Sequence, residues 1–169
     1  MGGNMPLNGL FHVAIKTASL EATRRFYTEV MGMVQDNSRP TTLNFPGVWL
    51  KSPLPGGQAL FHIYAGDAAL EADGSMARGC GVIDHVSVTT HGYYELRDRC
   101  REFGLPWREN VLPTVGLWQL FVYDPSKVLL ELTFAAAAEG RETPTFPEEL
   151  RYKPREDFFD PAAYRRFQG

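Results

Sequence analysis

Apolar and polar residues alternate along the stretch GLFHVAIKT near the start of the chain, and this alternation predicts a β-strand. Apolar residues at helical spacing, from Leu20 to Met31, predict a helix after this strand. Ser19 is suited to cap this helix, and Gly32 stands where it is expected to end. Prolines and the turn PLPGG then separate three short strand candidates, around 33–35, in TLNFPGVWL and in QALFHIYAG.

The same order of elements is written a second time. HVSVTT, beginning at His85, repeats the pattern of HVAIKT, beginning at His12. GVIDHVSVTT predicts a strand, YYELRDRCREF a helix, and WRENVL, GLWQLFVY and VLLELTF three more strands.

Two βαβββ modules are therefore expected, and the fold class is α+β. One such module cannot bury both faces of its own sheet, so the two copies should pair across a pseudo-twofold axis. We expect one domain over residues 1–134, made of modules 8–66 and 82–134, with a linker at 66–81. Residues 135–169 form a C-terminal extension that has no counterpart in the first module.

Four polar side chains stand at equivalent places in the two modules. His12 and His85 begin the first strands, while the last strands, ALFHIY and VLLELT, each hold one polar residue, His62 and Glu131. Alternation places all four on the strand face that points away from the helices. Any one of them alone is more often a structural or solvated residue. Together they predict a divalent-metal site, because a buried carboxylate is costly without a partner and imidazole and carboxylate are common metal ligands. The fourth histidine, His91, is expected to cap a helix or to lie on the surface.

The composition excludes several classes of partner. Apolar residues make up 44% and charged residues 22% of the 169 residues, and the net charge of −3 argues against nucleic acid or an anionic membrane as the main partner. No apolar run approaches the roughly 20 residues of a membrane span. The segment MGGNMPLNG does not have the pattern of a signal peptide, and Cys80 and Cys100 have no metal or redox spacing. We expect a cytoplasmic protein with reduced thiols.

Four motifs stand out in the sequence: FY-x-x-V-x-G-M, beginning at Phe26, DP-x-x-x-x-x-E, ending at Glu131, and the stretches HVAIKT and DHVSV. In these motifs, residues 8–134 resemble the vicinal oxygen chelate superfamily. This superfamily includes glyoxalase I, methylmalonyl-CoA epimerase, extradiol dioxygenases, fosfomycin-resistance and bleomycin-resistance proteins, and the stretch 39–64 looks like its small bacterial glyoxalase-like branch. The resemblance implies a cupped mixed β-sheet around one metal ion. Its ligands fall on His12, His62, His85 and Glu131. Where the family usually has Gly after "DP-x", this chain has Lys127, which should change a turn and not the site.

The resemblance implies an enzyme that chelates vicinal oxygens of a small substrate on zinc, nickel, cobalt, manganese or iron. Isomerase or lyase chemistry through a metal-bound enolate is favoured because His62 stands where isomerase-type members have a fourth ligand. An extradiol-type ring-cleaving dioxygenase with non-haem iron, in which His62 is a catalytic acid or base, remains open, as does a resistance protein that binds a small molecule without catalysis. A homodimer is expected. Candidate substrate contacts are Phe45, Trp49, Trp118, Gln119 and Phe121, and Arg39 or Lys51 could bind an anionic group, although solvation at the surface is the commoner role for both.

Overall fold

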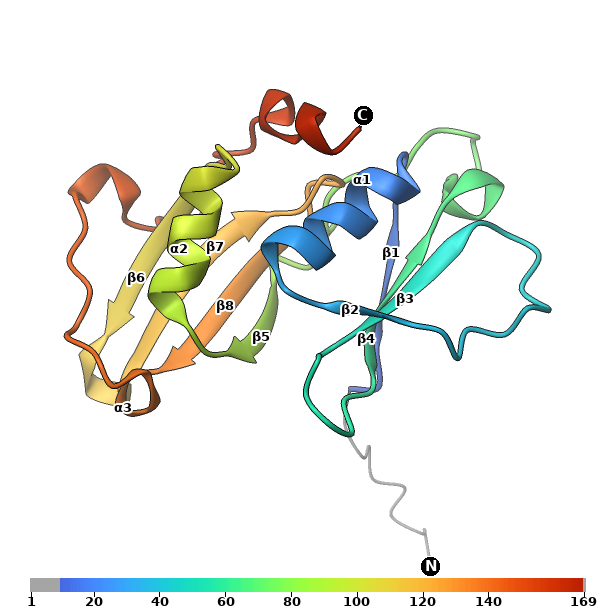
Figure 1. The fold of residues 1–169 in the computed structure, drawn as a ribbon. Coiled ribbons are helices and arrows are strands. Elements are labelled where there is room, and N and C mark those ends of the chain that lie inside the picture. The colour runs from blue at the N-terminus through green and yellow to red at the C-terminus, as the bar shows by residue number, and fades with distance from the viewer. Residues whose placement is uncertain (1–9, 169) are drawn as a thin grey trace, which may run out of the picture.

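Two four-stranded mixed sheets, each with a helix on one face, make up the computed structural model, which describes residues 10–168 (Figure 1). The predicted α+β class and the paired βαβββ modules are confirmed. The segment MGGNMPLNG, including the first two residues of the predicted module 8–66, lies outside the described residues. The first module consists of β1 (Val13–Lys16), α1 (Leu20–Arg25), β2 (Val34–Asp36), β3 (Gly47–Lys51) and β4 (Ala59–Tyr64). The second consists of β5 (Val86–Thr90), α2 (Tyr93–Glu102), β6 (Trp107–Leu112), β7 (Leu117–Tyr123) and β8 (Leu129–Ala135).

The two sheets have the same topology. Their strand orders are β1-β4-β3-β2 and β5-β8-β7-β6, and in both sheets the first and last strands of the module pair in parallel. Ala14 lies opposite His62 in the first sheet, and Ser87 lies opposite Glu131 in the second. Because His12 and His85 each stand two residues before these positions, the register confirms the predicted equivalence of the two pairs.

The first helix begins as the sequence predicts, since the Ser19 hydroxyl accepts a hydrogen bond from the Ala22 amide (3.3 Å). It then widens into a π-helical turn at Phe26–Val30, which the sequence pattern did not indicate. Phe26, Tyr27 and Val30 of this turn are all fully buried. Gly32 follows with a φ of 69°, the left-handed conformation expected at a helix end.

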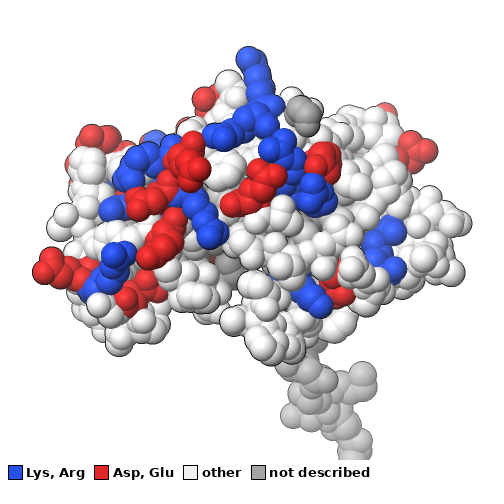
Figure 2. Space-filling view, viewed as in Figure 1, with Lys and Arg blue, Asp and Glu red and all other residues white. Residues whose placement is uncertain are grey.

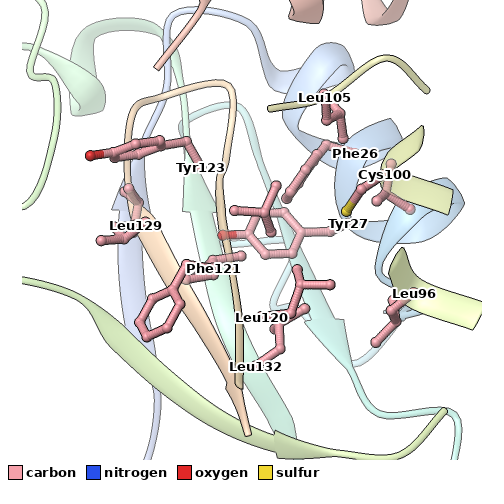
Figure 3. Close-up of a cluster of buried hydrophobic side chains, with 14 of the residues drawn as sticks. Phe26, Tyr27, Leu96, Cys100, Leu105, Leu120, Phe121, Tyr123, Leu129 and Leu132 are labelled. Atoms are coloured by element: carbon pink, nitrogen blue, oxygen red, sulfur yellow. The ribbon is translucent and has the colours of Figure 1, made fainter. Parts of the chain in front are cut away.

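One apolar core joins the two modules. Phe26 and Tyr27 of the first helix meet Leu96 and Cys100 of α2 above β7 and β8, as Figure 3 shows. The alternating residues of the strands that face the helices, such as Leu120, complete this core. The helix-facing side of each strand is thus committed to packing, so the other side alone can carry a site.

The extension after β8 also packs on both modules. It begins with a short helix, α3 (Ala136–Glu139), and ends in a 3₁₀ helix, Pro161–Phe167, at the C-terminal end in Figure 1. There the Arg25 guanidinium of α1 donates to the Arg166 carbonyl (3.1 Å), and the Arg166 guanidinium donates to the Glu102 carbonyl of α2 (3.0 Å). The tail therefore links the helices of the two modules.

Charges of both signs intermingle over the helices on the face that Figure 2 shows. Ion pairs along the helices account for much of this mixing, including Arg24 with Glu21 (2.5 Å) and Arg25 with Glu29 (2.7 Å). This face therefore lacks the single-sign basic surface that a nucleic-acid partner requires. Over residues 10–168, no helix has the length and apolar character needed to cross a membrane.

Asp124 is a fully buried carboxyl group in the turn before β8. Its Oδ1 accepts from the amides of Ser126 (2.9 Å) and Val128 (2.8 Å), and its Oδ2 accepts from the Tyr27 hydroxyl of the first module (3.2 Å). Burial raises the pKa of Asp124 to about 7, against the lowering effect of these hydrogen bonds. The folded protein consequently binds a proton here that the unfolded chain, with an ordinary pKa near 4, releases.

We predict that Asp124→Asn removes one component of the pH dependence of stability. The wild-type free energy of unfolding should decline as the pH rises from about 4 to about 7, because the folded state holds the proton more tightly. Asparagine keeps an oxygen for both amides and does not ionise, so the variant should gain stability relative to wild type over this range. Urea unfolding at a series of pH values measures the difference, and a difference that stays constant with pH would contradict the assignment.

Candidate functional site

The first module presents a stack of three rings on the sheet face that points away from the helices. The His62 imidazole lies between the Trp49 indole, at 4.1 Å between ring centroids, and the His12 imidazole, at 3.8 Å. The register explains this stack, since Trp49 of β3 and Ala14 of β1 both lie opposite His62 of β4.

Of the two stacked histidines, His62 is buried and His12 is half-buried. His62 is only 6% exposed. Burial, followed by the nearby His12, lowers the pKa of His62, which favours the neutral imidazole that a metal ion requires. The Nδ1 atom of His12 is buried and has no hydrogen-bond partner among the described residues. An unpaired buried nitrogen is unfavourable unless it meets a ligand or proton donor.

The second module presents its own pair at the equivalent positions. His85 Nε2 lies 3.1 Å from Glu131 Oε2, while the other oxygen of Glu131 accepts from the hydroxyls of Ser87 and Thr133, each at 2.8 Å. On the far side of the ring, His85 Nδ1 lies 2.7 Å from Asp84 Oδ2. A neutral imidazole has a single N–H, so it can donate to one carboxylate only. With that N–H turned to Asp84, the lone pair of Nε2 faces a carboxylate oxygen, an arrangement suited to a proton or cation between them.

The two pairs lie on separate sheets of the chain. Within residues 10–168, no group of three His, Cys, Asp or Glu side chains is close enough to hold a metal ion. Two hollows, of about 230 and 620 Å³, lie between the modules. The smaller one is lined by β1, by the linker and by Val86 of β5, and none of the four predicted ligands lines either hollow. One chain therefore presents two half-sites, which do not converge. The first half-site is the His12–His62 pair, and the second half-site is the His85–Glu131 pair.

Four of the five predicted substrate contacts lie on the same faces as these pairs. Trp49 stacks on His62, Phe121 lies opposite Glu131, and Gln119 lies opposite Thr133. Phe45 packs edge-on against Tyr64, at 4.9 Å between centroids, and Tyr64 stands two residues after His62 in β4.

The prediction for Trp118 is wrong. This residue lies opposite Phe134, on the helix-facing side of β7, and is buried against the rings of Tyr93 and Tyr94 of α2. Trp118 and Gln119 are adjacent in a strand, so they cannot share a face.

His91 is exposed, in agreement with the predicted surface role. It does not cap the helix. The amides of Gly92 and Tyr93 at the N-terminus of α2 instead donate to the carboxylate of Glu139 in the tail (3.1 and 2.9 Å). A carboxylate at this place also interacts favourably with the helix dipole.

Arg39 provides a cation near the first half-site. Its guanidinium lies over the Phe45 ring (5.2 Å to the centroid) and donates to the Phe45 carbonyl (2.7 Å). Arg39 lies close to Gly47, where an added Cβ would lie 2.6 Å from the Ile63 carbonyl oxygen and 3.3 Å from Arg39 Nη2. Its Nε is buried with no partner in the described part of the chain, whereas Lys51 lies 4.0 Å from the carboxylate of Asp36.

Sequence reasoning missed two residues beside the second half-site. Asp84 directly precedes His85 and lay within the motif DHVSV, so its position could have indicated a partner for the imidazole. Tyr152 of the tail stacks on Phe121 (3.8 Å between centroids, 8° between planes), and its hydroxyl donates to Asp84 Oδ2 (3.3 Å). No pattern in the sequence links Tyr152 to this site.

Comparison with known proteins identifies the fold. Neither the protein-family models nor the curated proteins include a match to this chain. Among solved structures, similar ones include a glyoxylase/bleomycin resistance protein/dioxygenase domain from Frankia sp. EAN1pec (22% identity, TM-score 0.52, covering 77% of this chain and 93% of that one). Lactoylglutathione lyase from Agrobacterium tumefaciens is also similar (16% identity, TM-score 0.52, covering 78% and 97%). So is a mutant of the fosfomycin resistance protein FosX from Listeria monocytogenes, solved with Mn(II) and a dihydroxypropylphosphonic acid (18% identity, TM-score 0.56, covering 77% and 94%).

The chain thus has the paired βαβββ fold of the glyoxalase/bleomycin resistance/dioxygenase superfamily, also called the vicinal oxygen chelate fold. At these identities the likeness concerns the fold alone. The activity has to be argued from the side chains that this chain places on it.

Proposed function

We propose that this protein is a divalent-metal-dependent enzyme of the glyoxalase type, in which His12, His62, His85 and Glu131 hold the cation. One observation carries the proposal: each module places two metal-competent side chains in contact at equivalent positions of the same register. The presence of Mn(II) in the FosX structure supports metal use in this fold generally.

The donors fit a metal ion chemically. His12 has a buried nitrogen without a partner among the residues described, and burial lowers the pKa of His62 and so favours its neutral form. The hydroxyls of Ser87 and Thr133 occupy one oxygen of Glu131 and leave Oε2 for a ligand bond. Asp84 holds the far nitrogen of His85, the kind of outer partner that orients histidine ligands.

The surroundings suit a small substrate with oxygens on neighbouring atoms. When bound, the cation supplies a Lewis acid that withdraws electron density from those oxygens, and this favours isomerase or lyase chemistry. Trp49 provides an apolar wall, Gln119 provides a polar contact, and the Arg39 guanidinium is placed to bind an anionic group of the substrate. Phe121, also a candidate contact, is 2% exposed beneath the Tyr152 ring and supports this face from within.

A second copy of the chain would complete the site. We propose a homodimer in which the His12–His62 pair of one copy faces the His85–Glu131 pair of the other. Strands β1 and β5 are both open sheet edges, which tend to be covered in native proteins. Exposed apolar side chains also stand directly before both half-sites, and a partner would cover them: Leu10, Phe11, Val82 and Ile83.

Replacing one proposed ligand should weaken metal binding. We expect Glu131→Gln to raise the dissociation constant for Mn(II) by more than about 10-fold, since even outer-sphere losses reach this scale. His91→Gln, at an exposed histidine outside the site, is the matched control and should leave it unchanged. Isothermal titration measures both, and equal effects would contradict the assignment.

Complementation tests whether two copies share the site. One variant carries His12→Ala and His62→Ala, and the other carries His85→Ala and Glu131→Gln. Neither homodimer should bind metal, whereas co-expression should restore about a quarter of the wild-type sites, because half of the dimers are mixed and each has one intact site. Sedimentation should show a dimer at micromolar concentration. If the co-expressed chains bind nothing, or wild type is a monomer, the shared site is refuted.

His62→Ala separates the possible chemistries. If His62 is a fourth ligand, metal affinity should fall by about 10- to 100-fold. If it is an acid or base beside a three-ligand iron site, metal content should stay intact while turnover falls by roughly 100- to 10,000-fold. We expect the first result. Elemental analysis of purified wild-type protein is the companion measurement: iron would support the extradiol dioxygenase, and no metal binding would support a non-catalytic binding protein.

A further inference from the structure

The tail reaches the face of the second sheet that carries His85 and Glu131. After α3 it passes β6 at the outer edge of that sheet (Figure 1). Arg151 forms a bridge with Glu109 of β6, and the amide of Tyr152 donates to the Glu109 carbonyl (2.9 Å). Pairing with an edge strand fixes the backbone at Tyr152, so its side chain has a defined direction.

That direction places Tyr152 over the site face. Its ring stacks on Phe121, which lies opposite Glu131 in the sheet and whose ring meets the His85 imidazole edge-on at 6.1 Å between centroids. The Tyr152 hydroxyl and His85 Nδ1 approach the same oxygen, Asp84 Oδ2, at 3.3 and 2.7 Å. The contacts run in one line, from Tyr152 through Asp84 and His85 to Glu131.

We propose that Tyr152 is a positioning residue, which fixes Asp84 so that Asp84 holds the N–H on Nδ1 of His85 and leaves Nε2 free beside Glu131. This inference rests on the proposed function only in that the freed Nε2 is the atom offered to the cation. It assigns part of the tail to the site. If the tail only packed on the two modules, it would be a structural extension and nothing more.

Asp84 needs such support. Its side chain is 68% exposed, and a carboxylate at that exposure can adopt several rotamers and exchange its partner for water. Burial and the nearby Asp84 carboxylate both raise the pKa of Tyr152, so its hydroxyl keeps its proton and remains a donor. The 3.3 Å separation is long for a hydrogen bond between oxygens, so we expect a smaller effect from Tyr152 than from Asp84 itself.

The tail is about as long as the part of the chain that similar structures leave unmatched. The similar solved structures match 76 to 79% of this chain and 93 to 99% of their own lengths. The uncovered share, about a fifth, is close to the length of the extension at 135–169. A residue of this extension at the site would distinguish this protein from others of the same fold.

The test uses Tyr152→Phe, which keeps the ring stacked on Phe121 and removes only the hydroxyl. Asp84→Ala removes the middle of the contact line. Tyr94→Phe is the matched control, because the Tyr94 hydroxyl also holds the tail, through the Glu142 carbonyl (2.9 Å), but contacts neither half-site. Thermal unfolding of each metal-free variant establishes that it is folded.

Two measurements are made on the full chain. Nitrogen chemical shifts, recorded at a pH well above the ordinary imidazole pKa of about 6.5, report the tautomer of neutral His85 without metal, and titration with Mn(II) reports affinity. We expect the Nδ1–H tautomer in wild type and Tyr94→Phe, and a mixture of tautomers in Tyr152→Phe and Asp84→Ala. Mn(II) affinity should fall by about 10- to 100-fold in Asp84→Ala, and by less, roughly 3- to 10-fold, in Tyr152→Phe.

The two readouts separate this inference from the proposed function. A wild-type protein that binds no Mn(II) would refute the metal site, while the tautomer of His85 would still test the role of Tyr152. If Tyr152→Phe leaves the tautomer unchanged, the inference is overturned whatever the metal result. An equal loss of affinity in Tyr94→Phe would also overturn it, because the effect would then come from anchoring the tail.

Discussion

The parallel pairing of β1 with β4, and of β5 with β8, is the constraint on which the rest of the structure depends. A parallel pair puts residues of equal phase on the same face, so the register that buries Ile15 against Ile63 also sets Ala14 beside His62. In the second module, the register that packs Val88 with Leu132 sets Ser87 beside Glu131. Slipping either pair by one residue would expose the core side and bury the polar side. Core and candidate site are therefore specified by the same backbone hydrogen bonds.

Much of this arrangement could be predicted because it is periodic. Alternation in the strands indicated which residues of each module face the helices, and the repeat aligned His12 with His85 and His62 with Glu131. Even the departure at Lys127 was visible in the sequence. That residue has a φ of 66°, a left-handed conformation that explains why glycine is usual at this place. Aromatic character alone makes Trp118 a candidate contact, but the phase of β7, which Gln119 and Phe121 share, turns Trp118 toward the helices.

The remaining features depend on contacts between distant segments. The path of the tail brings Tyr152 to Phe121 and Glu139 to the start of α2, and no local pattern encodes either contact. The separation of the half-sites is also a tertiary property. The equivalent positions in the two modules determine which polar side chains each module presents. The packing of the helices determines how the two modules are oriented relative to each other. The sequence could thus name the four side chains without determining whether one chain unites them.

The position of Phe167 has a consequence for the kinetics of folding. Its ring is fully buried, and it packs between Phe26 of the first helix and Phe103 at the end of α2. These contacts join segments from opposite ends of the described chain, and closing such large loops has an entropic cost before any packing energy is returned. Folding of this chain should therefore be slow for its size, with a late step in which the tail docks between two modules that have already formed their local hairpins.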